Sequence, residues 1–135
     1  MGEAVDGFIE VKVMSKILHL PLKAQWYEMI ESGVKTEEYR EIKAYWVQRL
    51  LVRCNGKRLK RDEALEYAFR EDMLKFPTLN EALKFKKYDA VKFSYGYTRR
   101  TMTFEIESIT IGKGNPEWGA PDKEVFVIKL GRRVA

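Results

Sequence analysis

The stretch from Ile17 to Ile42, ILHLPLKAQWYEMIESGVKTEEYREI, predicts a strand, a helix and a second strand in direct succession. The apolar run Ile17–Leu20 is typical of a short strand, and Pro21 is expected to end it because proline has no backbone N–H to donate to a ladder. Apolar residues at helical spacing then favour a helix over residues 24–32. After the helix, residues 36–42 alternate as a strand does. The fold therefore begins with a helix placed between its first two strands.

The junction between that helix and the second strand, GVKTEEYR, is dense in charge. Gly33 stands where a helix C-cap is expected, which gives it a structural role. On a strand, Glu38 and Arg40 share a face with about 6–7 Å between their α-carbons, and Lys35 at the strand's entry can turn toward the same side. A cap followed by a solvated charged strand explains the same residues. Lys35, Glu38 and Arg40 are nevertheless candidate ligand-binding side chains.

The middle of the chain is predicted to be a helical excursion over residues 43–86. It comprises a helix over residues 43–53, a second over 62–73 with Asp62 as its N-cap, and a short helix that a capping box opens at Thr78. The last third changes to a period of two, which predicts an antiparallel hairpin of residues 91–97 and 102–111. A loop over residues 112–121 and a buried strand over 125–130 complete the chain.

These elements predict an α+β fold with about five to six short, mostly antiparallel strands. We expect the first and last strands to pair, because closure into a small β-barrel leaves no exposed edges. Residues 16–135 are assigned to one domain, and residues 1–15 to a leader or an extra strand without further assignment.

Composition excludes several classes of protein. The chain has 25 basic and 20 acidic residues, which gives a net charge of +5 and favours a polyanion such as nucleic acid as a partner. It has one cysteine and one histidine, so neither a disulfide framework nor a usual zinc site is expected. No cofactor, metal or membrane partner is expected, and a cytoplasmic location is predicted. Inside the first strand, His19 is expected to be a buried imidazole with satisfied hydrogen bonds.

Further candidates for ligand contact come from exposed cations and aromatic side chains. Lys23, Arg99 and Arg100 would suit a phosphate-tracking surface, although charge at a hairpin tip also protects a sheet edge. Trp118, in a loop rich in proline and glycine, is equally consistent with a binding-site wall and with a plug over the barrel end. Some aromatic residues could stack bases, namely Tyr39, Tyr95 and Tyr97. Trp26 and Trp46 lie on apolar helical faces and are expected to pack in the core.

The order strand, helix, G-x-K-x-x-E-x-R, strand resembles the ASCH domain family, a branch of the PUA-like fold. The segment ITIGKGNPEWGAPDKEVFVIKLG is similar to the end of small ASCH proteins of bacteria and their prophages. The resemblance covers about residues 16–131 and treats the helical excursion as an insertion. It implies a β-barrel whose cleft binds RNA or a nucleotide-like ligand, with Gly33, Lys35, Glu38 and Arg40 at the family's motif positions.

The same resemblance implies an alternative function. Some small bacterial members are similar to amidohydrolases that remove the acetyl group from N4-acetylcytidine, in which the lysine matching Lys35 is catalytic. Glu38 replaces a threonine of those enzymes, and only Glu117 is offered for their second glutamate. An enzyme of this kind would use Lys35 and Glu38 without a metal. A protein-interaction module with a purely structural motif is a further alternative.

Overall fold

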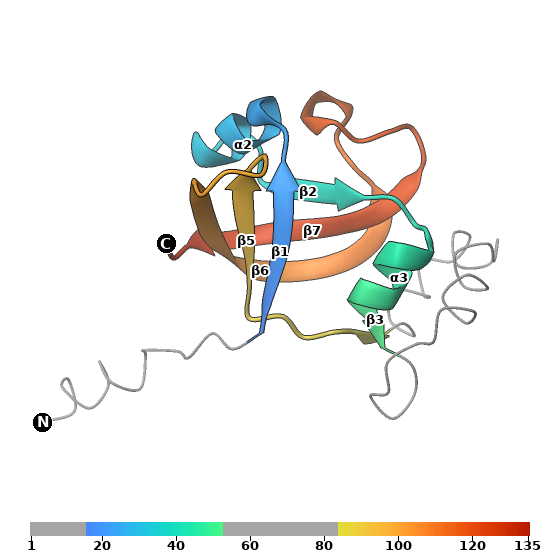
Figure 1. Cartoon of the computed structure of the whole chain (residues 1–135). Helices are drawn as coiled ribbons and strands as arrows, with labels where there is room; N and C mark the ends of the chain where they lie inside the picture. The colour runs from blue at the N-terminus through green and yellow to red at the C-terminus, as the bar shows by residue number, and fades with distance from the viewer. Residues whose placement is uncertain (1–15, 53–83) are drawn as a thin grey trace, which may run out of the picture.

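The computed structural model of the chain describes residues 16–52 and 84–135 (Figure 1). Two predictions lie outside these residues: the leader or extra strand of residues 1–15, and the two later helices of the helical excursion. The described part of that excursion begins with α3 (Ala44–Leu50). It continues in a two-stranded antiparallel sheet of β3 (Leu51–Val52) and β4 (Lys84–Phe85). The prediction of a helix through residue 53 is therefore wrong at Leu51 and Val52, because these residues pair with β4 instead of continuing the helix.

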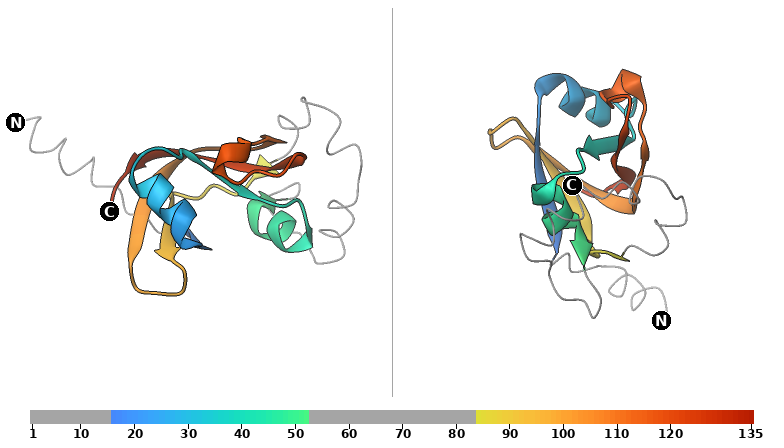
Figure 2. Two further views of the ribbon diagram at one scale, coloured as in Figure 1. Left: turned by 90° about the horizontal axis from the view of Figure 1, so that it is seen from above. Right: turned by 90° about the vertical axis from the view of Figure 1, so that its right-hand side faces the viewer.

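The main sheet has five strands in the order β1-β5-β6-β7-β2. The strands are β1 (Ile17–Leu22), β5 (Ala90–Tyr95), β6 (Thr101–Lys113), β7 (Glu124–Arg133) and β2 (Glu37–Arg40). β1 runs parallel to β5, and the other three pairings are antiparallel. The sheet is strongly curled into a half-barrel (Figures 1 and 2). The α+β class, the helix after the first strand and the hairpin of β5 and β6 are confirmed.

The predicted pairing of the first and last strands is wrong. β7 pairs with β6 along one edge and with β2 along the other, so neither edge is left for the first strand. β1 pairs with β5 instead, and β1 and β2 become the two edges. The half-barrel therefore has a seam between these two edge strands.

The prediction that Pro21 ends the first strand is also wrong, because β1 continues to Leu22. Pro21 lies opposite Ser94 on an edge strand, where a missing N–H can face away from the ladder.

The prediction that His19 is buried is wrong, because side chains along β1 alternate between the core and the outer face. Leu18, Leu20 and Leu22 point into the core, so His19 lies on the outer face and is exposed.

The core lies on the concave side of the sheet and is closed by the helices. α2 (Ala24–Glu31) buries Tyr27 and Ile30, whereas Trp26, which was expected to pack in the core, is half-buried. α3 contributes Val47 and Leu50. The sheet supplies the larger part of the cluster, including Leu18, Leu20, Val91, Phe93, Met102, Phe126 and Ile128. Burial of these apolar side chains supplies the main driving force that holds α2 against the sheet. None of the helices in residues 16–52 and 84–135 has the length and apolarity needed to cross a bilayer.

Candidate functional site at the seam of the half-barrel

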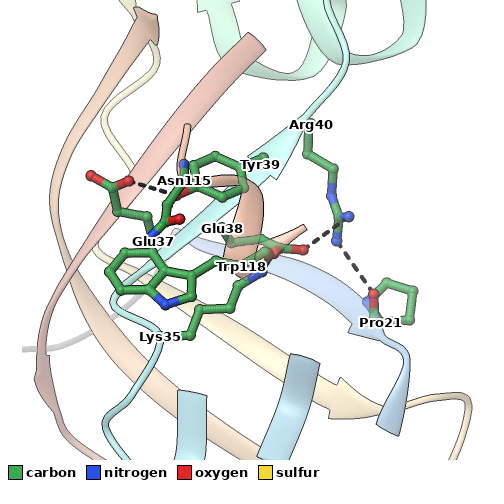
Figure 3. Close-up of polar contacts among 8 residues, drawn as sticks. All are labelled: Pro21, Lys35, Glu37, Glu38, Tyr39, Arg40, Asn115 and Trp118. Atoms are coloured by element: carbon green, nitrogen blue, oxygen red, sulfur yellow. Dashed lines mark hydrogen bonds and ion pairs between the residues drawn. The ribbon is translucent and has the colours of Figure 1, made fainter. Parts of the chain in front are cut away.

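The charged motif lies at the seam, where the two edge strands approach each other without pairing. β2 carries Arg40, whose Nη2 donates to the carbonyl oxygen of Pro21 on β1 at 3.3 Å (Figure 3). A side chain thus joins the two edges that backbone hydrogen bonds leave apart. We call Lys35, Glu38, Arg40 and Trp118 the seam site.

Lys35 owes its position to the end of α2. Gly33 has a φ of 85°, in the left-handed region, which turns the chain back so that the Lys35 amide donates to the carbonyl of Met29 at 3.0 Å. The Lys35 side chain then enters the protein, and only 2% of the residue is exposed. Gly33 therefore ends the helix as predicted, and the turn that it makes directs the Lys35 side chain into the protein.

The Lys35 ammonium lies among a carboxylate, a carbonyl and two aromatic rings. Its Nζ is 2.9 Å from Glu38 Oε1 and donates to the Trp118 carbonyl oxygen at 2.5 Å. The same nitrogen is 4.6 Å from the ring centroid of Trp26 and 5.3 Å from that of Tyr39. Oxygen acceptors and ring faces together replace the hydration that burial removes from the ammonium.

Glu38 joins the two cations. It is 4% exposed, with Oε1 toward Lys35 and Oε2 at 3.0 Å from Arg40 Nη1 (Figure 3). Burial is expensive for an isolated carboxylate but tolerable when both of its oxygens accept charge-assisted hydrogen bonds. One carboxylate between two cations leaves the seam site with a net charge of +1.

Arg40 forms the accessible end of the seam site. About 20% of its side chain is exposed, compared with 2% for that of Lys35. The guanidinium carbon lies 5.2 Å from the ring centroid of Trp46, and Nε is buried without a hydrogen-bond partner. Trp46 is half-buried and packs against the core as predicted, and it also positions Arg40. The guanidinium therefore retains donor capacity beyond Glu38 and Pro21.

Tyr39 holds the loop that covers Lys35. Its hydroxyl donates to Glu37 Oε1 at 2.7 Å and accepts from the Asn115 amide at 3.0 Å (Figure 3). Burial raises the pKa of Tyr39 far above its usual value, and the carboxylate of Glu37 adds to the rise, while the Asn115 amide opposes it. The folded protein therefore keeps the Tyr39 hydroxyl protonated and uncharged.

The raised pKa of Tyr39 predicts a loss of stability in strong base. In the unfolded chain, Tyr39 has its usual pKa of 10.0 and loses its proton above pH 10. In the folded protein its pKa is higher, so the hydroxyl keeps its proton. The free energy of unfolding should then fall with pH, by about 1.4 kcal/mol per unit from this residue. Urea unfolding at several pH values above 10 should show a shallower fall for Tyr39→Phe than for the parent, and equal slopes would contradict the prediction.

The loop that follows β6 contributes a backbone carbonyl, that of Trp118, to the seam site. The Trp118 ring was expected to form a binding-site wall or a plug. Its short 3-10 helix η2 (Pro116–Trp118) begins with Asn115, whose side chain accepts from the Glu117 amide at 2.9 Å. Trp118 is half-buried and gives its carbonyl to Lys35, while its ring packs against Tyr39, Ala120, Val125 and Val127. Glu117 is exposed, and its carboxylate makes no polar contact with the described residues.

The remaining predicted cations lie at the end of β1 and at the hairpin tip. Lys23 is exposed at the N-cap position of α2. Arg100 is bound to α2 by an ion pair of 2.7 Å with Glu31 and lies over the rings of Tyr27 and Tyr95. Arg99 is exposed and makes no ion pair or hydrogen bond with the described residues. Arg100 therefore has a structural role, and Lys23 and Arg99 keep free ammonium and guanidinium groups.

The sequence did not predict that three aromatic rings beside the seam site, those of Trp26, Tyr39 and Trp46, would contact its two cations. Trp26 and Trp46 were expected only to pack in the core, yet each presents a ring to one of the two cations. Their position on helices that flank the charged strand in the sequence could have indicated these contacts.

No group of three or more metal-ligating His, Cys, Asp or Glu side chains occurs in the described part of the chain. Comparison with protein-family models, with curated proteins and with solved structures finds no match to this chain.

Proposed function

We propose that the protein binds RNA or a nucleotide ligand at the seam site, with Arg40 as the group that meets the ligand. The observation that carries the proposal is the charge of the site: Glu38 contacts both Lys35 and Arg40, so one of the two positive charges remains uncompensated, and the Arg40 side chain, about 20% exposed, is the part of the pair that solvent reaches. Arginine presents several N–H donors in a planar fork that matches phosphate oxygens. The resemblance to the ASCH family supports the same ligand class.

The surroundings of Arg40 suit a phosphate. Its partner Pro21 lies two residues before Lys23, which is exposed, so two cations flank the end of β1. The chain as a whole carries a net charge of +5, which favours association with a polyanion. A nucleotide phosphate held here would add a charged acceptor to a guanidinium that already lies against Trp46.

Arg40→Gln should weaken RNA binding by about 10- to 100-fold, because a charge-assisted hydrogen bond to phosphate is lost. The slope of log K against log salt should also fall by about 1 in magnitude. Fluorescence anisotropy with a labelled RNA across a salt titration measures both quantities. Glu38 keeps its contact with Lys35 in this variant, so the fold should survive.

Lys87→Ala is the matched control, because Lys87 is exposed and lies just before β5, at the opposite end of that strand from the hairpin tip. It should bind RNA almost as the parent does. Arg40→Gln that binds with the parent's affinity and salt slope would overturn the proposal. A loss of stability without a loss of binding would instead assign the motif to a structural role, as the hypothesis of a protein-interaction module requires.

One observation favours the amidohydrolase as a second candidate. Lys35 Nζ lies 2.9 Å from the buried carboxylate of Glu38, so the two side chains that this hypothesis requires are in direct contact. The reaction would be hydrolysis, in which water cleaves an acyl amide into a carboxylic acid and an amine. Incubation with N4-acetylcytidine should release cytidine and acetate in the parent but not in Lys35→Met, and no release by the parent would remove this candidate.

A further inference from the structure

The turn between β5 and β6 holds an aromatic side chain almost entirely in solvent. Tyr97 is 97% exposed, more than Val34 and Tyr45, which are the other exposed large apolar side chains of the described residues. Single exposed apolar residues are common on protein surfaces. Tyr97 differs because the turn that carries it is fixed and because a free cation lies two residues away.

Several hydrogen bonds fix the turn. The Tyr95 amide donates to the Arg100 carbonyl at 2.9 Å, and the Thr98 hydroxyl donates to the Tyr95 carbonyl at 2.6 Å. Gly96 has a φ of 57° and donates from its amide to the Leu22 carbonyl at 2.7 Å, which ties the turn to the end of β1. Tyr97 is therefore held outward by its backbone, and it gains no compensating contact within the described fold.

Arg100 and Arg99 have different roles at the tip of the hairpin. Arg100 anchors the turn to α2 through Glu31 and through the rings of Tyr27 and Tyr95. Arg99, exposed and without an ion pair among the described residues, stays available beside Tyr97. The tip thus presents one aromatic face and one free guanidinium, the pair of groups that binds a base and its phosphate.

The tip is continuous with the seam site. Two consecutive carbonyls at the end of β1 have partners on opposite sides, since Pro21 accepts from Arg40 and Leu22 accepts from Gly96. Lys23 follows directly and is exposed. Figure 1 shows the turn between β5 and β6, the end of β1 and α2 at the same end of the sheet. Cations therefore continue from Arg40 through Lys23 to Arg99.

We infer that the ligand is a single-stranded RNA, with one base stacked on Tyr97 and the backbone following Arg99, Lys23 and Arg40. The inference rests on the proposed function and narrows it, because a mononucleotide bound at Arg40 would leave the tip unused. Stacking is tolerant of base identity, since every base has a π-face, so little sequence preference is expected at Tyr97.

The test compares an unstructured RNA of about 10 nucleotides with a mononucleotide such as CMP. Tyr97→Ala should weaken binding of the oligonucleotide by about 5- to 100-fold and leave binding of CMP unchanged. Tyr97→Phe should keep the parent's affinity, because the ring is retained. Both variants should unfold at the parent's urea midpoint, since Tyr97 is exposed.

The outcomes separate this inference from the proposed function. If Arg40→Gln loses both ligands while Tyr97→Ala binds the oligonucleotide as the parent does, the proposed function stands and the stacking inference is wrong. A parent that binds CMP but not the oligonucleotide overturns the inference in the same way. A parent that binds neither ligand overturns both, and the exposed tip would then be assigned to contact with a partner other than RNA.

Discussion

Glu38→Gln should lower the free energy of unfolding by about 3–5 kcal/mol, the largest effect expected from a single charge in this protein. Glutamine has nearly the shape of glutamate, so the change removes a charge and little volume. Lys35, 2% exposed, would lose the carboxylate at 2.9 Å and remain as an uncompensated buried ammonium. Arg40 is less affected because its side chain still reaches solvent. Equilibrium unfolding in urea measures the difference.

A second substitution tests the cause of that loss. Lys35→Met in the Glu38→Gln background removes the buried charge and should restore part of the stability, because the uncompensated ammonium is gone. A double variant no more stable than Glu38→Gln would show that the cost has another origin. Glu41→Gln is the matched control, since its exposed carboxylate lies 3.9 Å from Lys123, and it should change stability by less than about 0.5 kcal/mol.

Gly114→Ala should destabilise the protein by about 1–3 kcal/mol through overpacking. A β-carbon at Gly114 would lie 2.6 Å from Cζ of Tyr39 and 2.7 Å from the β-carbon of Ala120, and it would overlap Cε1 of Tyr39 as well. The Tyr39 ring cannot yield easily because its hydroxyl is bonded to Glu37 and to Asn115. The loop must therefore shift, and with it the Trp118 carbonyl that accepts from Lys35.

Gly112→Ala provides the control, two residues earlier in the chain. Gly112 lies in β6, whereas Gly114 follows that strand. A β-carbon at Gly112 meets only Glu124 Oε2, at 3.9 Å, which is an ordinary contact. This variant should unfold within about 0.5 kcal/mol of the parent. The two alanine variants share the same change in composition, so a difference between them in urea unfolding reports the packing of the loop. Equal stabilities would mean that the loop does not need the close approach at Gly114.

The local parts of the seam site were predictable because strand periodicity is a local property. Glu38 and Arg40, two residues apart on β2, were expected to share a face, and their side chains form an ion pair of 3.0 Å. Gly33 was expected as a cap, and its positive φ carries the chain toward Lys35. The burial of this charged strand was not evident, because the interpretation as a solvated surface strand fitted the same residues.

The contacts that bury the site depend on pairings between distant segments. Lys35 and Trp118 are 83 residues apart, and they meet because β7 pairs with β2 and brings the loop before it over Lys35. The prediction of a closed barrel failed for the same reason, since both sides of β7 are occupied and β1 turns to β5. His19 was misplaced because an apolar run does not reveal which face of an edge strand lies inward.

By itself, the sequence determined the strand–helix–strand opening, the β5–β6 hairpin and the alignment of Glu38 with Arg40, all through spacings of a few residues. Only the tertiary structure decided that β1 and β2 are the edges, that Arg40 spans them, and that Lys35 is enclosed by Trp26, Tyr39 and the Trp118 carbonyl. Local spacing limits which side chains share a face. Which faces become buried depends on competition among strands for partners, and that competition is settled across the whole chain.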